Sequence, residues 1–197
     1  MMPNKKYIYV LFVLMILAQI FVPAQMIFHQ KNILSVGTLL KFKTQPVDPS
    51  DPFRGKYISL NFEADEVDVL NKKDFTQDEK VYALLTTDSL GFAKIETLSK
   101  VKPTNSNLYL KVKINYFNYD NDNRVTVQLP FNRFYMNEHK AQKAEDLYRQ
   151  SAQNTQNTTC AIVALLDGDA VIKDVLIDGI PIKEAVAAAQ TGQKNKN

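Results

Sequence analysis

The 197-residue chain has few of the residues on which many catalytic and binding sites depend. A single cysteine, Cys160, excludes an internal disulfide and a zinc cluster built from cysteines. Only two histidines, His29 and His139, remove most zinc sites and most histidine-based catalysis. The net charge is +3 with no long basic run, so nucleic-acid binding has no electrostatic footprint. We therefore expect no metal, no cofactor and no nucleic-acid partner.

What the chain does have is a long apolar segment near its N-terminus. Residues 7–22 contain one clearly polar side chain, Gln19, and the apolar character extends to Phe28. A 22-residue helix rises about 33 Å, enough to cross a hydrocarbon core of about 30 Å. We predict a single-pass membrane anchor over residues 7–28.

The flanking charges predict how this anchor is oriented. Two lysines within residues 1–6 precede the apolar segment, so the positive-inside rule places the N-terminus in the cytoplasm. Residues 29–190 are then expected outside the cytoplasmic membrane, in the periplasm or the extracellular space. The alternative is a signal peptide cleaved near Ala24, but the apolar run continues past that position, and its length favours a retained anchor.

The exported residues alternate between apolar and polar side chains in many short segments, which predicts strands. We expect an α+β fold that is mainly β, a small antiparallel barrel or sandwich of about eight or nine strands. The segment 159–166 is apolar on both faces and is predicted to be a central strand. One helix is expected from Asn137 to Arg149 and a second, short one over residues 183–190, before a disordered tail at 191–197.

The sequence offers two possible sets of reactive groups, and neither is complete. An acidic cluster at residues 63–68 could bind calcium, but the EF-hand pattern with its glycine is absent, so we expect a solvated loop. Ser59 and Lys56 could form a hydrolytic dyad, but their spacing along one strand points them to opposite faces. We therefore favour a non-catalytic protein, with an exported Ser/Lys hydrolase as the alternative.

A rigid, proline-rich segment precedes one of the predicted strands. Its shape-setting residues are Pro46, Asp48, Pro49, Asp51, Pro52 and Gly55. Arg54 and Tyr57 follow them, and both residue types are enriched at binding hot spots, so we predict these two as binding residues. In the alternative reading, Arg54 pairs with an aspartate of the same segment and stabilises the turn.

This segment resembles the signature of the GDYXXLXY protein family. The matching positions are Gly55, Lys56, Tyr57, Ile58, Ser59, Leu60, Asn61 and Phe62. Lys56 stands where the motif has Asp, and Phe62 where it has Tyr. The resemblance continues in PFNRFYMNE, which contains Arg133 and Tyr135, and in LDGDAVIKDVLIDG, so three blocks occur in the family's order.

The resemblance implies a bacterial membrane-anchored protein of a family whose function is unknown. Members of this family tend to accompany polytopic membrane proteins, which implies a partner of that kind. Lys56 in place of Asp argues against metal binding or general-base work at that position. Our leading hypothesis is an accessory module for a membrane protein. A barrel that binds a small ligand stays open, and a cavity lined by Tyr57, Tyr109 or Phe117 would favour it.

Overall fold

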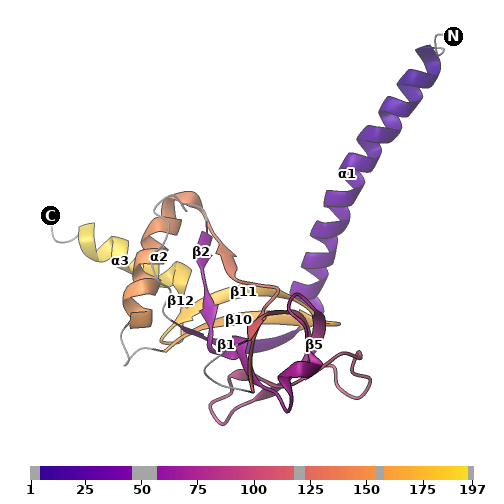
Figure 1. The fold of residues 1–197 in the computed structure, drawn as a ribbon. Helices are drawn as coiled ribbons and strands as arrows, with labels where there is room; N and C mark the ends of the chain where they lie inside the picture. The colour runs from indigo at the N-terminus through magenta and orange to yellow at the C-terminus, as the bar shows by residue number, and fades with distance from the viewer. Residues whose placement is uncertain (1–4, 46–56, 118–122, 154–157, 195–197) are drawn as a thin grey trace.

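The computed structural model describes residues 5–45, 57–117, 123–153 and 158–194. A long N-terminal helix projects from a β-rich domain that carries two further helices on one side (Figure 1). The α-helices are α1 (Lys5–Val36), α2 (Glu138–Gln153) and α3 (Ile182–Lys194), and two 3-10 turns are η1 (Glu63–Asp65) and η2 (Lys72–Asp74). The strands are β1 (Thr38–Gln45), β2 (Tyr57–Ser59), β3 (Asn61–Phe62), β4 (Glu66–Asp68), β5 (Lys80–Thr87), β6 (Ala93–Ser99), β7 (Tyr109–Phe117), β8 (Arg124–Gln128), β9 (Arg133–Tyr135), β10 (Thr159–Leu166), β11 (Asp169–Ile177) and β12 (Ile180–Pro181).

Helix α1 is long and apolar enough to cross a membrane once. Its side chains are exposed along most of its length, as expected for a segment whose solvent is lipid. Pro23 lies inside the helix and does not end it. The helix also continues over residues 29–36, past the predicted end of the anchor, which adds about 12 Å at 1.5 Å per residue.

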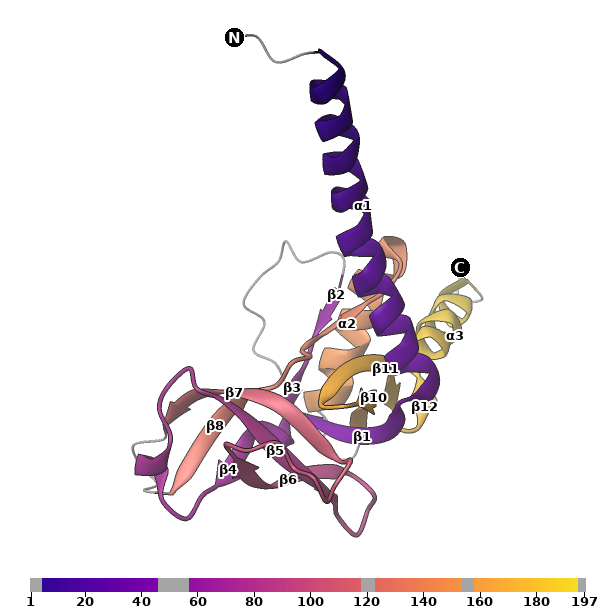
Figure 2. The ribbon, with the colours of Figure 1, turned by 90° about the vertical axis from the view of Figure 1, so that its right-hand side faces the viewer.

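The strands form three antiparallel sheets, which confirms the predicted mainly β, α+β class. One five-stranded sheet has the order β12-β11-β10-β1-β3, and a second, curled one has the order β4-β8-β7-β5-β6. The strand predicted to be central, β10, lies between β1 and β11. Strands β2 and β9 pair only with each other and form the third sheet. Figure 2 shows the curled sheet at the end of the domain away from α1.

Three aromatic rings form the centre of the core between the sheets. Phe42 of β1, Phe62 of β3 and Phe131 pack edge to face, with ring centroids 5.2–6.1 Å apart. All three side chains are buried. Edge-to-face packing is a favoured geometry for aromatic rings, and these rings come from segments far apart in the chain. Phe62 occupies the last position of the family-like motif, so the motif contributes directly to the core.

Three expectations from the sequence were wrong in detail. The strand expected directly after the proline-rich segment is not continuous: residues 57–62 form two strands, because β2 pairs with β9 and β3 pairs with β1. The acidic segment 63–68 is not a solvated loop: it forms η1 and β4, and Ala64 and Val67 are buried. The described residues contain twelve strands rather than eight or nine, because several of them are only two or three residues long.

The C-terminal helices are present, and both are longer than predicted. Helix α2 begins directly after Asn137 and continues to Gln153, and α3 continues to Lys194, into the segment expected to be disordered. Tyr148 of α2 is buried and donates a hydrogen bond of 3.2 Å from its hydroxyl to the backbone oxygen of Gln45. Burial raises the pKa of Tyr148 to about 12, so this hydroxyl stays neutral and continues to link α2 to β1.

Candidate functional site: an exposed arginine–tyrosine cluster

Residues from two of the three motif blocks meet on the small sheet of β2 and β9. The antiparallel register places Tyr57 opposite Tyr135 and Ser59 opposite Arg133. Between them, Ile58 lies opposite Phe134, and both of these side chains are buried. The two-residue period of a strand therefore separates a face in the core from a face toward solvent. The solvent face brings together Tyr57, Arg133 and Tyr135, which we call the Arg–Tyr cluster.

The geometry of the Arg–Tyr cluster is that of a preformed recognition surface. The Arg133 guanidinium lies 4.8 Å from the centre of the Tyr57 ring, within the range of a cation–π interaction. The Tyr57 and Tyr135 rings lie 5.5 Å apart, and Tyr135 is 65% exposed. Among the described residues, no carboxylate pairs with Arg133. The cluster thus presents a cation and two aromatic rings that are held in place by each other.

The other predicted site residues divide into two groups. Leu60 and Phe62 are buried, so their role is in the core. The proline-rich segment lies outside the described residues, and with it Pro46, Asp48, Pro49, Asp51, Pro52, Arg54 and Gly55. The binding prediction for Arg54 and its alternative, a pairing with an aspartate, are therefore not tested. Sequence reasoning assigned Arg133 and Tyr135 to a structural block and missed their contact with Tyr57, because the strand pairing was not visible in the sequence.

The cluster lies on the side of the domain from which α1 departs. Figures 1 and 2 show β2 and α2 rising from the body of the domain in the same general direction as α1. The end of the small sheet that carries Tyr57 and Tyr135 is the end at which β9 leads into α2. Any membrane that contains α1 would therefore face this end of the small sheet.

A second feature that the sequence did not reveal is the junction between α1 and the domain. Ile33 is buried against the domain, and the Gly37 N–H donates a hydrogen bond of 2.9 Å to the Ile33 carbonyl. His29 Nε2 lies 3.2 Å from one carboxylate oxygen of Asp169, and Lys111 Nζ donates to the other at 2.9 Å. The last turns of α1 thus contact β10 and β11, and Lys111 of β7 holds the Asp169 carboxylate that meets His29. The helix and the domain form one unit.

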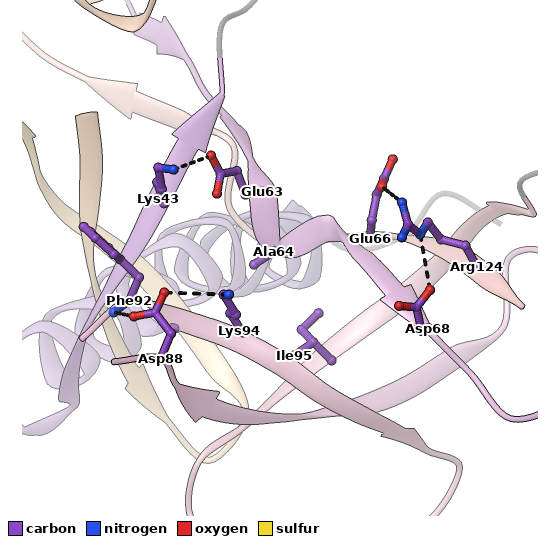
Figure 3. Close-up of a pocket in the computed structure, with 11 residues that line it drawn as sticks. Lys43, Glu63, Ala64, Glu66, Asp68, Asp88, Phe92, Lys94, Ile95 and Arg124 are labelled. Carbon is purple, nitrogen blue, oxygen red and sulfur yellow. Dashed lines mark hydrogen bonds and ion pairs between the residues drawn. The ribbon is translucent and has the colours of Figure 1, made fainter. Parts of the chain in front are cut away.

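A charged pocket of about 280 Å³ is lined by residues of β1, η1, β4, β6 and β8 (Figure 3). Its charged side chains already pair with one another: Lys43 with Glu63, Lys94 with Asp88, and Arg124 with both Glu66 and Asp68. Hydrogen bonds from backbone N–H groups, above all that of Phe92, lower the pKa of Asp88 and keep it ionised. These ion pairs connect β1 to η1, β6 to the turn before it, and β8 to β4, so the lining residues leave little unpaired charge for a ligand.

A second, open pocket of about 260 Å³ is lined by parts of both motif blocks. Asp65 and several amide side chains line it, together with Leu60, Phe62 and Phe131. Burial, followed by the charge of Glu66, raises the pKa of Asp65. Neither pocket includes Tyr57, Tyr109 or Phe117, the residues whose cavity would have favoured a ligand-binding barrel.

The raised pKa of Asp65 gives a prediction about stability and pH. The folded state binds this proton more tightly than the unfolded state, so stability falls as pH rises above the ordinary aspartate pKa of about 3.9. Asp65→Asn is therefore expected to raise the Tm at pH 7 by about 1–2 °C, because Asp65 is only partly buried. The difference between variant and wild type should disappear near pH 3.5 in paired thermal melts, and a difference that grows on acidification would contradict this assignment.

The described residues do not support the alternative of a Ser/Lys hydrolase. A lysine base must be buried to lose its proton near neutral pH, and no lysine is buried among the residues whose burial is described. Ser59 lies on the half-buried face of β2, opposite Arg133. Cys160 is buried, and burial raises the pKa of its thiol, which makes it a poor nucleophile.

The comparisons with known proteins agree with the two motif blocks that form the small sheet. A family model, GDYXXLXY protein, matches residues 19–175. The chain belongs to this family. No curated protein and no solved structure matches it. In this GDYXXLXY protein, the structure gives four of the six described motif positions a physical role: Tyr57 faces outward beneath Arg133, while Ile58, Leu60 and Phe62 face the core.

Proposed function

We propose that this GDYXXLXY protein is a membrane-anchored accessory module that binds a polytopic membrane protein through its Arg–Tyr cluster. The observation that carries the proposal is the cluster itself: Arg133 stacks on Tyr57, Tyr57 contacts Tyr135, and no carboxylate among the described residues pairs with the arginine. The cluster lies on the side from which α1 departs. Arginine and tyrosine dominate the energetics of many protein interfaces. A partner embedded in the same membrane would meet this surface first.

The topology in this proposal follows from the N-terminal sequence. Helix α1 is retained as a signal anchor, with the lysines at its start in the cytoplasm and the domain in the periplasm or outside the cell. The docked junction at His29 and Ile33 favours retention, because cleavage near Ala24 would leave the docked turns without the rest of their helix. Intact mass of the membrane-bound protein checks this point: loss of the first 24 residues would contradict the anchor.

Photocrosslinking from the cluster tests the partner contact. A benzophenone amino acid in place of Tyr135, in the full-length chain in native membranes, is expected to capture a polytopic membrane protein. Tyr116 on β7 is a matched control position, because its side chain is 51% exposed and lies on a different sheet. Arg133→Ala should lower the yield at position 135 by about tenfold or more, as for a hot-spot residue. Equal capture from positions 116 and 135, or none from position 135, would contradict the proposal.

A further inference from the structure

Of the two glutamines in the predicted span, Gln19 and Gln25, Gln19 is the one near the middle of the bilayer, where the surroundings are least polar. Gln19 lies next to the midpoint of the predicted span, residues 7–28, and its side chain is exposed on α1. A side-chain amide without a hydrogen-bond partner in hydrocarbon costs several kcal/mol. Glutamine side chains in membranes commonly satisfy this need by bonding to a polar group on a neighbouring helix. No other described segment of the chain runs beside this part of α1 (Figures 1 and 2).

The helical period places Gln19 on a defined face of α1. Gln19, Met26 and Ile33 are spaced by seven residues, just under two turns of 3.6 residues, so they lie along one face. Ile33 is the residue of this face that is buried against the domain. Gln19 therefore points toward the side of α1 on which the domain lies, and Figure 1 shows the domain extending to that side. The Gln19 face therefore lines the corner between anchor and domain, which β2 and α2 border on the domain side (Figures 1 and 2).

We propose that a transmembrane helix of the polytopic partner occupies this corner and bonds to Gln19 with a polar side chain at the middle of the bilayer. This inference rests on the proposed function and adds a contact inside the membrane to the contact at the cluster. Helix α1 continues about 12 Å beyond the predicted span, over residues 29–36, before it enters the domain, and β2 and α2 rise from the domain beside it (Figure 1).

The position of the domain argues against a second copy of this chain as the occupant. Two copies whose α1 helices met at Gln19 would each extend a domain over the shared side, and the two domains would compete for the same space. A polytopic protein with short loops has no such domain. The corner therefore fits a helix that ends near the membrane surface.

Crosslinking from within the anchor tests this inference. A benzophenone amino acid at Met26 lies on the Gln19 face, whereas one at Phe28 lies on the opposite face, nine residues or two and a half turns from Gln19. In native membranes, position 26 is expected to capture a polytopic protein and position 28 is not. Gln19→Leu should reduce capture from position 26 by about three- to thirtyfold, the range expected for one hydrogen bond between helices, and Gln19→Asn should retain most of it.

The outcomes separate this inference from the proposed function. Capture from Tyr135 but not from Met26, or capture unaffected by Gln19→Leu, would overturn the helix contact and leave the cluster contact standing. Capture from neither position would overturn both. A product containing two differently tagged copies of this chain, captured from Met26, would show a homodimer and overturn the assignment to a polytopic partner.

Discussion

Replacing Phe62 with alanine is expected to lower the free energy of unfolding by about 3–5 kcal/mol, the usual cost of removing a buried phenylalanine. The ring is 2% exposed and packs edge to face with Phe42 and Phe131. These partners come from β1 and from the segment before β9, so the cavity would lie where distant parts of the chain meet. Denaturant unfolding of the detergent-solubilised protein, followed by tyrosine fluorescence, measures the change.

Phe62→Tyr is the matched control, since tyrosine is the residue of the family motif at this position. Phe62 also lines the open pocket beside Asp65, so an added hydroxyl has a route to polar surroundings. We expect a change below about 1 kcal/mol, because the hydroxyl need not be buried without a partner. A large loss for Phe62→Tyr would mean that the ring is oriented differently, and a small loss for Phe62→Ala would contradict the packing of the three rings.

The second large effect is expected at Gly168, in the turn between β10 and β11. Its φ is +82°, and a Cβ atom built there would lie 2.6 Å from Cε2 of Tyr109. Gly168→Ala therefore combines left-handed backbone strain of about 1–2 kcal/mol with overpacking of about 1–3 kcal/mol. Because the Tyr109 ring is buried, it has little room to move away.

Gly179 provides the control for the backbone contribution. It has nearly the same φ, +81°, in the turn before β12, but no atom lies within 4 Å of an added Cβ. Gly179→Ala should therefore cost only the backbone strain of about 1–2 kcal/mol. The difference between the two variants, measured by chemical denaturation, isolates the contact with Tyr109. Equal losses in the two variants would contradict that contact.

The sequence predicted the parts of the fold that depend on local patterns. Alternation predicted that the exported residues form many short strands, and the two-sided apolar character of 159–166 identified the central strand β10. Prediction from the sequence failed where packing or pairing with a distant segment decides the local structure. Residues 56–62 alternate like a single strand, yet Leu60 lies between two strands that pair with different neighbours. Three acidic residues of 63–68, Glu63, Glu66 and Asp68, are exposed and Asp65 is half-buried, while Ala64 and Val67 supply the buried positions.

The candidate site was predicted in part, for the same reason. Tyr57 was selected from the residues around it, but its partners Arg133 and Tyr135 lie more than 70 positions away, and only the pairing of β2 with β9 brings them together. No local sequence pattern indicated the junction between α1 and the domain. His29 and Asp169 are 140 residues apart, and each is an ordinary polar residue in its own segment.

The most direct test of the central claim is a measurement of which end of the domain faces the bilayer. A fluorophore on Tyr135→Cys or on Leu70→Cys reports this in liposomes whose lipids carry a headgroup quencher. Cys160 is buried with a raised thiol pKa and should react little with the dye. Leu70 is fully exposed in the bend that follows β4. Strand β4 belongs to the curled sheet, which lies away from α1 (Figure 2). We predict strong quenching at position 135 and weak quenching at position 70. Equal quenching, or the reverse order, would contradict a domain that holds its Arg–Tyr cluster toward the membrane.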